Sequence, residues 1–169
     1  HICLVHAMNF IKKNKANFQI VLTGDKKSQF DSKVFKDFIK EIKKNNLEEF
    51  FSYLGKVPYK DLANLIYNSQ AVINPSHFEG WSTIVEEAKI LDKNIILSDI
   101  KVHKEQNPKN SFYFDPKKPK ELSKILFKLS KKKLDITHKN KLNSNFISKR
   151  KEFANNFIKI VDYVHHRLK

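Results

Sequence analysis

The sequence predicts an α/β fold, a Rossmann-like parallel sheet with helices on both faces. Short β-rich runs alternate with longer helical patterns, each of the three glycines follows such a run directly, and 169 residues suit one domain. Strands joined through helices need right-handed crossovers, which make the strands parallel. Ligands of such sheets bind outside the carboxyl ends of the strands, so the loops there are the first place to look for a site.

The first half of the chain contains an opening helix and two strand–helix units. Ile2, Val5 and Met8 lie near helical spacing, and two lysines follow at the favourable C-terminal end of the helix. The next two β-rich runs end at glycines, and a proline opens the helix that follows the second. In order, these elements are a helix over 1–13, a strand over 17–24, a helix over 30–42, a strand over 49–55 and a helix from Pro58 through 69.

The second half continues the alternation and ends in a long amphipathic pattern. Its elements are a strand over 71–76, a helix over 82–91, strands over 94–99 and 111–115, a helix over 121–133 and a helix over 142–168 with a break near 148–151. His103 and Glu105 follow the strand over 94–99 in a loop, and two alternatives stay open for them: they border the site, or the loop has no role in it. We therefore expect a Rossmann-like domain over 1–133 and an amphipathic helical segment over 134–169 that packs on it.

Positive charge is concentrated in the last third of the chain. Residues 1–115 carry 17 Lys and Arg against 14 Asp and Glu, whereas residues 116–169 carry 16 against 4. This basic segment leaves two alternatives open, a nucleic-acid-binding module and a surface that docks on an anionic membrane. Its aromatic residues have the spacing of a helix core, not of a base-stacking platform, and runs of Lys on helices are usually solvated.

Composition and motifs exclude several classes of protein. A single cysteine, Cys3, allows no internal disulfide, which favours a reducing, cytoplasmic setting. The apolar runs are much shorter than the ~18 residues that span a bilayer. The seven histidines show no metal-ligand spacing, and neither a nucleophile elbow nor a phosphate-binding P-loop motif occurs. We expect neither a metal nor a cofactor.

The segment NPSHFEGWSTIVEEAK, residues 74–89, has the residues of an anion-binding site. It runs from a strand end through a loop into a helix that starts near Ser82 and Thr83. Backbone N–H groups at this helix start, two hydroxyl groups and the helix dipole suit a diphosphate. Glu79 in the loop and Glu87 in the helix lie on either side of that position.

This segment resembles the signature of glycosyltransferase family 4, a family of retaining enzymes with the GT-B fold, in which two glutamates are separated by seven residues. Other stretches resemble the family in the family's order. They are LTG at 22–24, YLGKVPYKDLANLIYNSQAVINPS at 53–76 and KNIILSDIKVHKEQ at 93–106, followed by FYFDP. The resemblance covers roughly residues 1–130, which look like the C-terminal, donor-binding domain of such an enzyme.

The resemblance implies a role for each site residue. Glu79 would contact the donor sugar and Glu87 the ribose of the nucleotide, as the catalytic pair. The remaining donor-binding residues would lie in the loops that follow three strands: Gly24, Gly55, Val57, Gly80, Trp81, Ser82 and Thr83. Val57 would border the base, and the residues from Gly80 to Thr83 would offer backbone N–H groups to the donor. No divalent metal is implied.

The resemblance also implies parts that this sequence does not contain. HICLVHAMNFIKK is typical of a helix already under way, so we expect the chain to be truncated at its N-terminus. The missing parts would be an opening strand, a pair of basic residues that grip the diphosphate, and an N-terminal acceptor domain of the same enzyme. The expected function is sugar transfer from a nucleoside diphosphate sugar to a glycan or lipid-linked acceptor in polysaccharide biosynthesis, in the cytoplasm with peripheral contact at the inner membrane. The fragment alone is expected to be inactive.

Overall fold

The structure of the protein is a computed structural model that describes residues 1–14, 18–25, 32–132, 151–152 and 154–165. The chain divides into two compact units, His1–Lys133 and Leu134–Lys169. In the second unit, residues 151–152 and 154–165 are helical, and apolar side chains such as Phe157 and Ile160 are exposed. The packing of this segment on the first unit stays a prediction.

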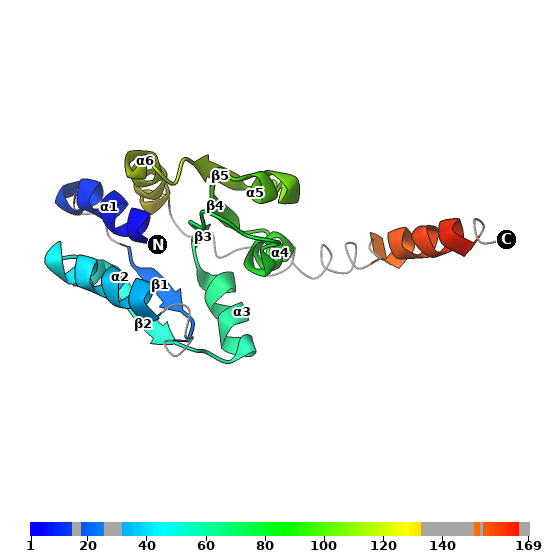
Figure 1. Ribbon diagram of the computed structural model, residues 1–169, viewed down its shortest axis with the longest axis horizontal. Helices are drawn as coiled ribbons and strands as arrows, with labels where there is room; N and C mark the ends of the chain where they lie inside the picture. Colours follow the sequence, from blue (N-terminus) through cyan, green and yellow to red (C-terminus); the bar gives the residue numbers. More distant parts are fainter. Residues whose placement is uncertain (15–17, 26–31, 133–150, 153, 166–169) are drawn as a thin grey trace. The chain divides into compact units, whose positions relative to one another are not determined.

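The first unit alternates strands and helices along the chain (Figure 1). The strands are β1 (Ile20–Thr23), β2 (Phe51–Gly55), β3 (Ala71–Asn74), β4 (Asn94–Ser98) and β5 (Ser111–Phe114). The α-helices are α1 (Ile2–Ile11), α2 (Ser32–Lys44), α3 (Tyr59–Asn68), α4 (Thr83–Ile90), α5 (Lys101–Gln106) and α6 (Pro119–Ser130). Two short 3₁₀ helices, η1 (Lys12–Asn14) and η2 (Glu48–Phe50), complete the described elements.

Every strand pairing in the described residues is parallel. β1 pairs with β2, and a second sheet has the order β3-β4-β5, with Ile96 opposite both Ile73 and Phe112. The predicted α/β class with parallel strands is confirmed. The structure differs from the prediction in having two sheets, because β1 bonds only to β2 and β3 only to β4.

Helices cover both faces of the three-stranded sheet. Successive side chains of β4 point to opposite faces, so they alternate between two apolar cores. Ile96 packs into a large cluster that includes residues of α1, α2 and α6. Its neighbours Ile95 and Leu97 point the other way, into a smaller cluster with residues of α3 and α4. All three side chains are at most 1% exposed, so β4 is the centre of the fold.

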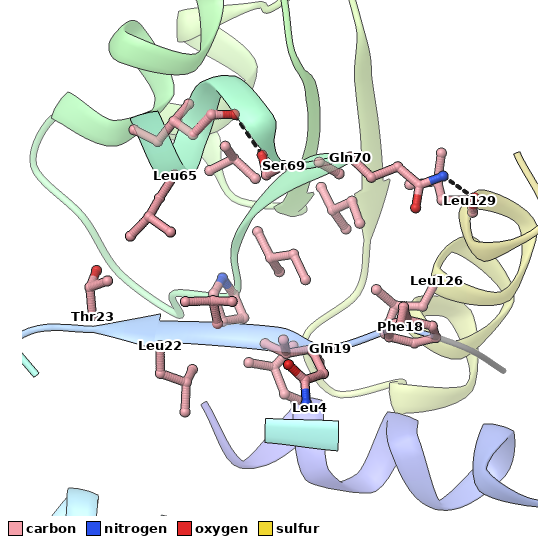
Figure 2. A pocket seen from close by; sticks show the side chains of 18 of the residues that line it. Leu4, Phe18, Gln19, Leu22, Thr23, Leu65, Ser69, Gln70, Leu126 and Leu129 are labelled. Carbon is pink, nitrogen blue, oxygen red and sulfur yellow. Dashed lines mark hydrogen bonds between the residues drawn. The ribbon is translucent and has the colours of Figure 1, made fainter. Parts of the chain in front are cut away.

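A cavity of about 320 Å³ separates β1 from β3 (Figure 2). Both strands line it, and helices contribute apolar side chains that include Leu4, Leu65, Leu126 and Leu129. None of the residues that the sequence predicts for donor binding lines this cavity. It is therefore a feature of the fold, and the candidate site lies elsewhere.

A short helix, α5, replaces the loop that the sequence predicts between β4 and β5. Its six residues include a buried Val102, His103 and Gln106. One apolar residue in six gives no helical period, which explains why the pattern does not indicate it. The helix ends at Asn107, which has a left-handed backbone with φ 39°.

Candidate functional site

The candidate site lies where β3 ends and α4 begins. β3 stops at Asn74, residues 75–82 form a loop, and Ser82 is the N-cap of α4. The first N–H groups of a helix have no partner within it, and the helix dipole makes this end positive. The loop and the first turn of α4 can therefore attract an anion at the carboxyl end of a parallel strand.

Asn74 joins both ends of this loop through one buried side-chain amide. Its Nδ2 donates to Glu79 Oε1 and to Ser82 Oγ, each at 2.8 Å, and its Oδ1 accepts from the backbone N–H of Ser76 at 3.2 Å. The residue is only 4% exposed, so these bonds form out of water. Asn74 was not predicted as a site residue from the sequence. The indication that was available is its position, as a polar residue at the end of a buried strand.

Glu79 is the carboxylate at the centre of this network. The hydroxyl of Ser76 also donates to its Oε1, at 2.8 Å. Burial by itself would raise the pKa of Glu79, but hydrogen bonds from Asn74 and Ser76, the charge of His103 and a hydrogen bond from Ser82 outweigh it, so the pKa lies below its ordinary value. Glu79 is therefore a fixed negative charge whose side chain is still partly exposed.

Ser82 is placed differently from the expectation that its hydroxyl faces an anion. The residue is the N-cap of α4, but its side chain makes no capping hydrogen bond and is 2% exposed. Its oxygen accepts from Asn74 instead, because the buried amide of Asn74 needs an acceptor. The neighbouring Thr83 is exposed to solvent.

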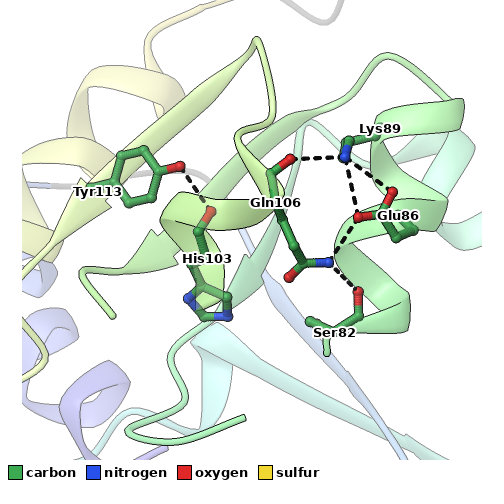
Figure 3. A network of polar contacts seen from close by, with 6 residues as sticks. All are labelled: Ser82, Glu86, Lys89, His103, Gln106 and Tyr113. Carbon is green, nitrogen blue, oxygen red and sulfur yellow. Dashed lines mark hydrogen bonds and ion pairs between the residues drawn. The ribbon is translucent and has the colours of Figure 1, made fainter. Parts of the chain in front are cut away.

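Two adjacent glutamates in α4, Glu86 and Glu87, have different surroundings, and Figure 3 shows those of Glu86. Glu86 forms an ion pair with Lys89 at 3.0 Å and accepts from Gln106 Nε2 at 2.9 Å, which ties α4 to α5. The side chain of Glu87 is partly exposed and makes no hydrogen bond or ion pair with any residue that the structure describes. Of the two, Glu87 is the carboxylate that can bind a ligand hydroxyl.

Aromatic side chains of the same loop are exposed to solvent. Trp81 is 57% exposed and Phe78 is 88% exposed, on either side of Glu79 and Gly80. Aromatic rings on a protein surface provide flat apolar area for a sugar or a base. Trp81 was predicted as a donor-binding residue from the sequence, but Phe78 was not. The only indication of Phe78 in the sequence is that it is an apolar residue inside a polar loop.

The structure brings Gly24 and Gly55 together. Gly24 follows β1 directly and Gly55 is the last residue of its partner strand β2, and the N–H of Gly24 donates to the carbonyl of Gly55 at 2.9 Å. Both have positive φ values, 139° and 73°. The half-buried Val57 follows Gly55 in the same loop region, whereas Gly80 belongs to the loop after β3, in the other sheet.

Neither a metal-binding group nor a membrane-spanning helix occurs among the described residues. In the described ranges, no group of three or more His, Cys, Asp and Glu side chains could hold a metal ion. No helix among them is both long and apolar enough to cross a membrane.

Residues 1–153 match the family described as "Glycosyl transferases group 1". The fold resembles Anabaena Alr3699/HepE, solved in complex with UDP and glucose, with a TM-score of 0.68 and 16% identity, and 94% of this chain covers 44% of that one. It also resembles a glycosyltransferase from Rickettsia africae ESF-5, with a TM-score of 0.65, 20% identity and the same coverage. This chain thus spans less than half the length of either structure.

No curated protein matches the sequence significantly. The family match, by contrast, includes all the strands, the loop that carries Glu79 and the helix that carries Glu87. Because this match covers most of the chain, the protein belongs to the glycosyl transferases group 1 family.

Proposed function

We propose that this chain is the donor-binding part of a retaining hexosyltransferase of glycosyltransferase family 4. The enzyme would transfer a sugar from a nucleoside diphosphate sugar to a glycan or lipid-linked acceptor, in polysaccharide biosynthesis. The observation that supports this function best is the fixed, charged and partly exposed Glu79 at the entrance to α4. An oriented carboxylate of this kind can hold sugar hydroxyls in one geometry.

Each part of the site suits one part of such a donor. Glu79 would bind the sugar, the N-terminal turn of α4 the diphosphate, and Glu87 the ribose. The leaving group is a diphosphate, so catalysis would consist largely of stabilising its developing negative charge with N–H dipoles. The paired loops that carry Gly24, Gly55 and Val57 would border the base.

A uridine nucleotide is the donor class with the most direct support. The Anabaena protein has been solved in complex with UDP, with UDP and glucose, and with UDP-glucose. We carry UDP-glucose over to this chain as the first ligand to test. Acceptor contacts would come from an N-terminal domain of the same enzyme, in the cytoplasm and with peripheral contact at an anionic membrane surface.

The alternative of a nucleic-acid-binding module is not favoured. The family match continues through residue 153 and therefore includes much of the basic C-terminal third. The positive charge of that segment needs no nucleic acid to explain it, because charged residues on helices are usually solvated.

The proposal is tested by NMR titration of the ¹⁵N-labelled chain with UDP-glucose and with UDP. Glu87→Gln should weaken the binding of both ligands, and Glu79→Gln should weaken UDP-glucose binding with little effect on UDP. Each lost hydrogen bond to a charged group is expected to weaken affinity roughly ten- to a hundredfold.

A matched control is Glu48→Gln, because Glu48 is an exposed glutamate of η2, before the start of β2 and outside this network. Its affinities for both ligands should equal those of the unmodified chain. Equal losses for UDP and UDP-glucose in both site variants would contradict the division of roles. Absence of binding to either ligand by the unmodified chain would contradict donor binding by this part of the enzyme.

A further inference from the structure

His103 is a completely buried imidazole that the proposed function does not use. It lies on α5, directly behind the loop that carries Glu79, and is 0% exposed. The hydroxyl of Tyr113 on β5 donates to its backbone carbonyl at 3.1 Å, and Gln106 of the same helix donates to the carbonyl of Ser82 at 2.9 Å (Figure 3). α5 is thereby fixed to both β5 and the start of α4.

The hydrogen bonds of His103 define its tautomer. Its Nδ1 lies 2.9 Å from the backbone carbonyl of Ser98 and 3.2 Å from the hydroxyl of the same residue. A carbonyl oxygen can only accept, so Nδ1 carries the hydrogen and donates it. The hydroxyl of Ser98 is then free to donate elsewhere.

That hydroxyl donates to the backbone carbonyl of Ser76, in the loop after β3. The side chain of Ser76 in turn donates to Glu79 Oε1 at 2.8 Å. Hydrogen bonds therefore link His103 to Ser98, Ser98 to the backbone of Ser76, and the side chain of Ser76 to Glu79. They connect the ends of two neighbouring parallel strands, β3 and β4, beneath the candidate site.

His103 also acts on Glu79 through electrostatics. Nε2 is buried and has no hydrogen-bond partner among the described residues. The charge interaction with His103 is one of the factors that lower the pKa of Glu79. The other factors are hydrogen bonds from Asn74, Ser76 and Ser82, while burial acts in the opposite direction.

We propose that Ser98 and His103 are positioning residues for Glu79, which hold the loop after β3 so that its carboxylate faces the donor sugar. This inference rests on the proposed function for the role of Glu79. It goes beyond that function by assigning a task to two buried residues that never contact the donor.

The test combines two measurements on the 169-residue chain. The first is a ¹³C-carboxyl NMR titration that follows the pKa of Glu79, with its signal identified by its absence in Glu79→Gln. The second is NMR titration with UDP-glucose and with UDP. Ser98→Ala should raise the pKa of Glu79 and weaken UDP-glucose binding about tenfold, the effect expected from losing one hydrogen bond, with UDP binding unchanged.

Ser123→Ala is the matched control, because Ser123 is a buried serine of α6 outside this network, whose hydroxyl bonds only to the carbonyl of Lys120. His103→Asn adds a conservative variant, since an Asn amide can still donate to the Ser98 carbonyl although it lacks the imidazole ring. It should keep most of the UDP-glucose affinity that His103→Ala loses, while the pKa of Glu79 should rise in both variants.

Two outcomes would overturn the positioning role. The first is that the pKa of Glu79 is the same in Ser98→Ala as in Ser123→Ala. The second is that Ser98→Ala loses UDP binding and UDP-glucose binding equally, which a purely structural defect would cause. If the unmodified chain binds neither ligand, the proposed function fails by itself. The carboxyl titration then still decides whether Ser98 and His103 act on Glu79.

Discussion

At the scale of single residues, the site depends on how the carboxylate of Glu79 is surrounded. One amide and two hydroxyl groups converge on it from Asn74, Ser76 and Ser82. These groups favour the charged form over the protonated form. A carboxylate that is charged and oriented before ligand arrives loses little freedom on binding, which is what a sugar-positioning group requires.

The lowered pKa of Glu79 predicts a pH-dependent contribution to stability. A carboxyl whose pKa is lower in the folded state stabilises the fold above the unfolded value of about 4.3, and this contribution is lost as the pH falls through the folded value. The unfolding free-energy difference between the unmodified chain and Glu79→Gln should therefore shrink as the pH falls from 6 to 3. Urea denaturation at several pH values measures it, and a difference independent of pH would contradict the network.

At the scale of elements, the ends of the strands set the shape of the loops around the site. β2 ends at Gly55, whose φ of 73° is one that other residues rarely adopt. This backbone turns the chain toward Val57 and places the Gly55 carbonyl where the N–H of Gly24 can bond to it. The loop after β3 is different, because Gly80 does not have a positive φ.

This contrast predicts unequal effects of the same substitution. Gly55→Ala should lower the free energy of unfolding by about 1–2 kcal/mol, the cost of a left-handed backbone for a residue with a Cβ atom. Steric crowding adds little, because the new Cβ would meet only Tyr53, at 3.9 Å. Gly80→Ala should be close to neutral in the same urea denaturation, since nothing lies within 4 Å of its added Cβ. Equal losses in both variants would show that the backbone of Gly55 is not the cause.

At the scale of the whole first unit, the sheet is interrupted between β1 and β3. Each of these strands bonds to a neighbour on one side and faces the 320 Å³ cavity on the other. The order β2-β1, then β3-β4-β5, matches the 3-2-1-4-5-6 order of doubly wound sheets with one position open. β4, in contrast, is paired on both sides.

Hydrogen exchange should reveal this interruption. In a parallel strand, alternate residues direct their N–H groups to opposite sides. About every second amide of β1 and β3 should therefore exchange at least about tenfold faster than the amides of Ile95, Ile96 and Leu97 in β4. NMR-detected exchange measures this. Uniform protection along β1 would show that the two sheets join in solution.

The sequence by itself determined the α/β class and most element positions, and it predicted two glutamates as candidate site residues. These features depend on local patterns: the period of apolar residues distinguishes strands from helices, and glycines mark where strands end. Glu79 and Glu87 could be predicted as a pair because the loop after β3 and the helix α4 are contiguous in the chain. A resemblance between short motifs then related them to a family of glycosyltransferases, and the family match places the chain in the glycosyl transferases group 1.

Only the tertiary structure decided which groups surround those glutamates. Ser98 and His103 lie far along the chain from Glu79, and the pairing of β3 with β4 brings them beneath it. Two other contacts act in the same region: Asn74 turns the hydroxyl of Ser82 inward, and the bond from Gln106 to the Ser82 carbonyl stabilises the short helix α5. The physical reason is that a sequence pattern shows which side chains prefer burial, but a hydrogen bond also needs a partner, and distant partners are set by how the elements pack.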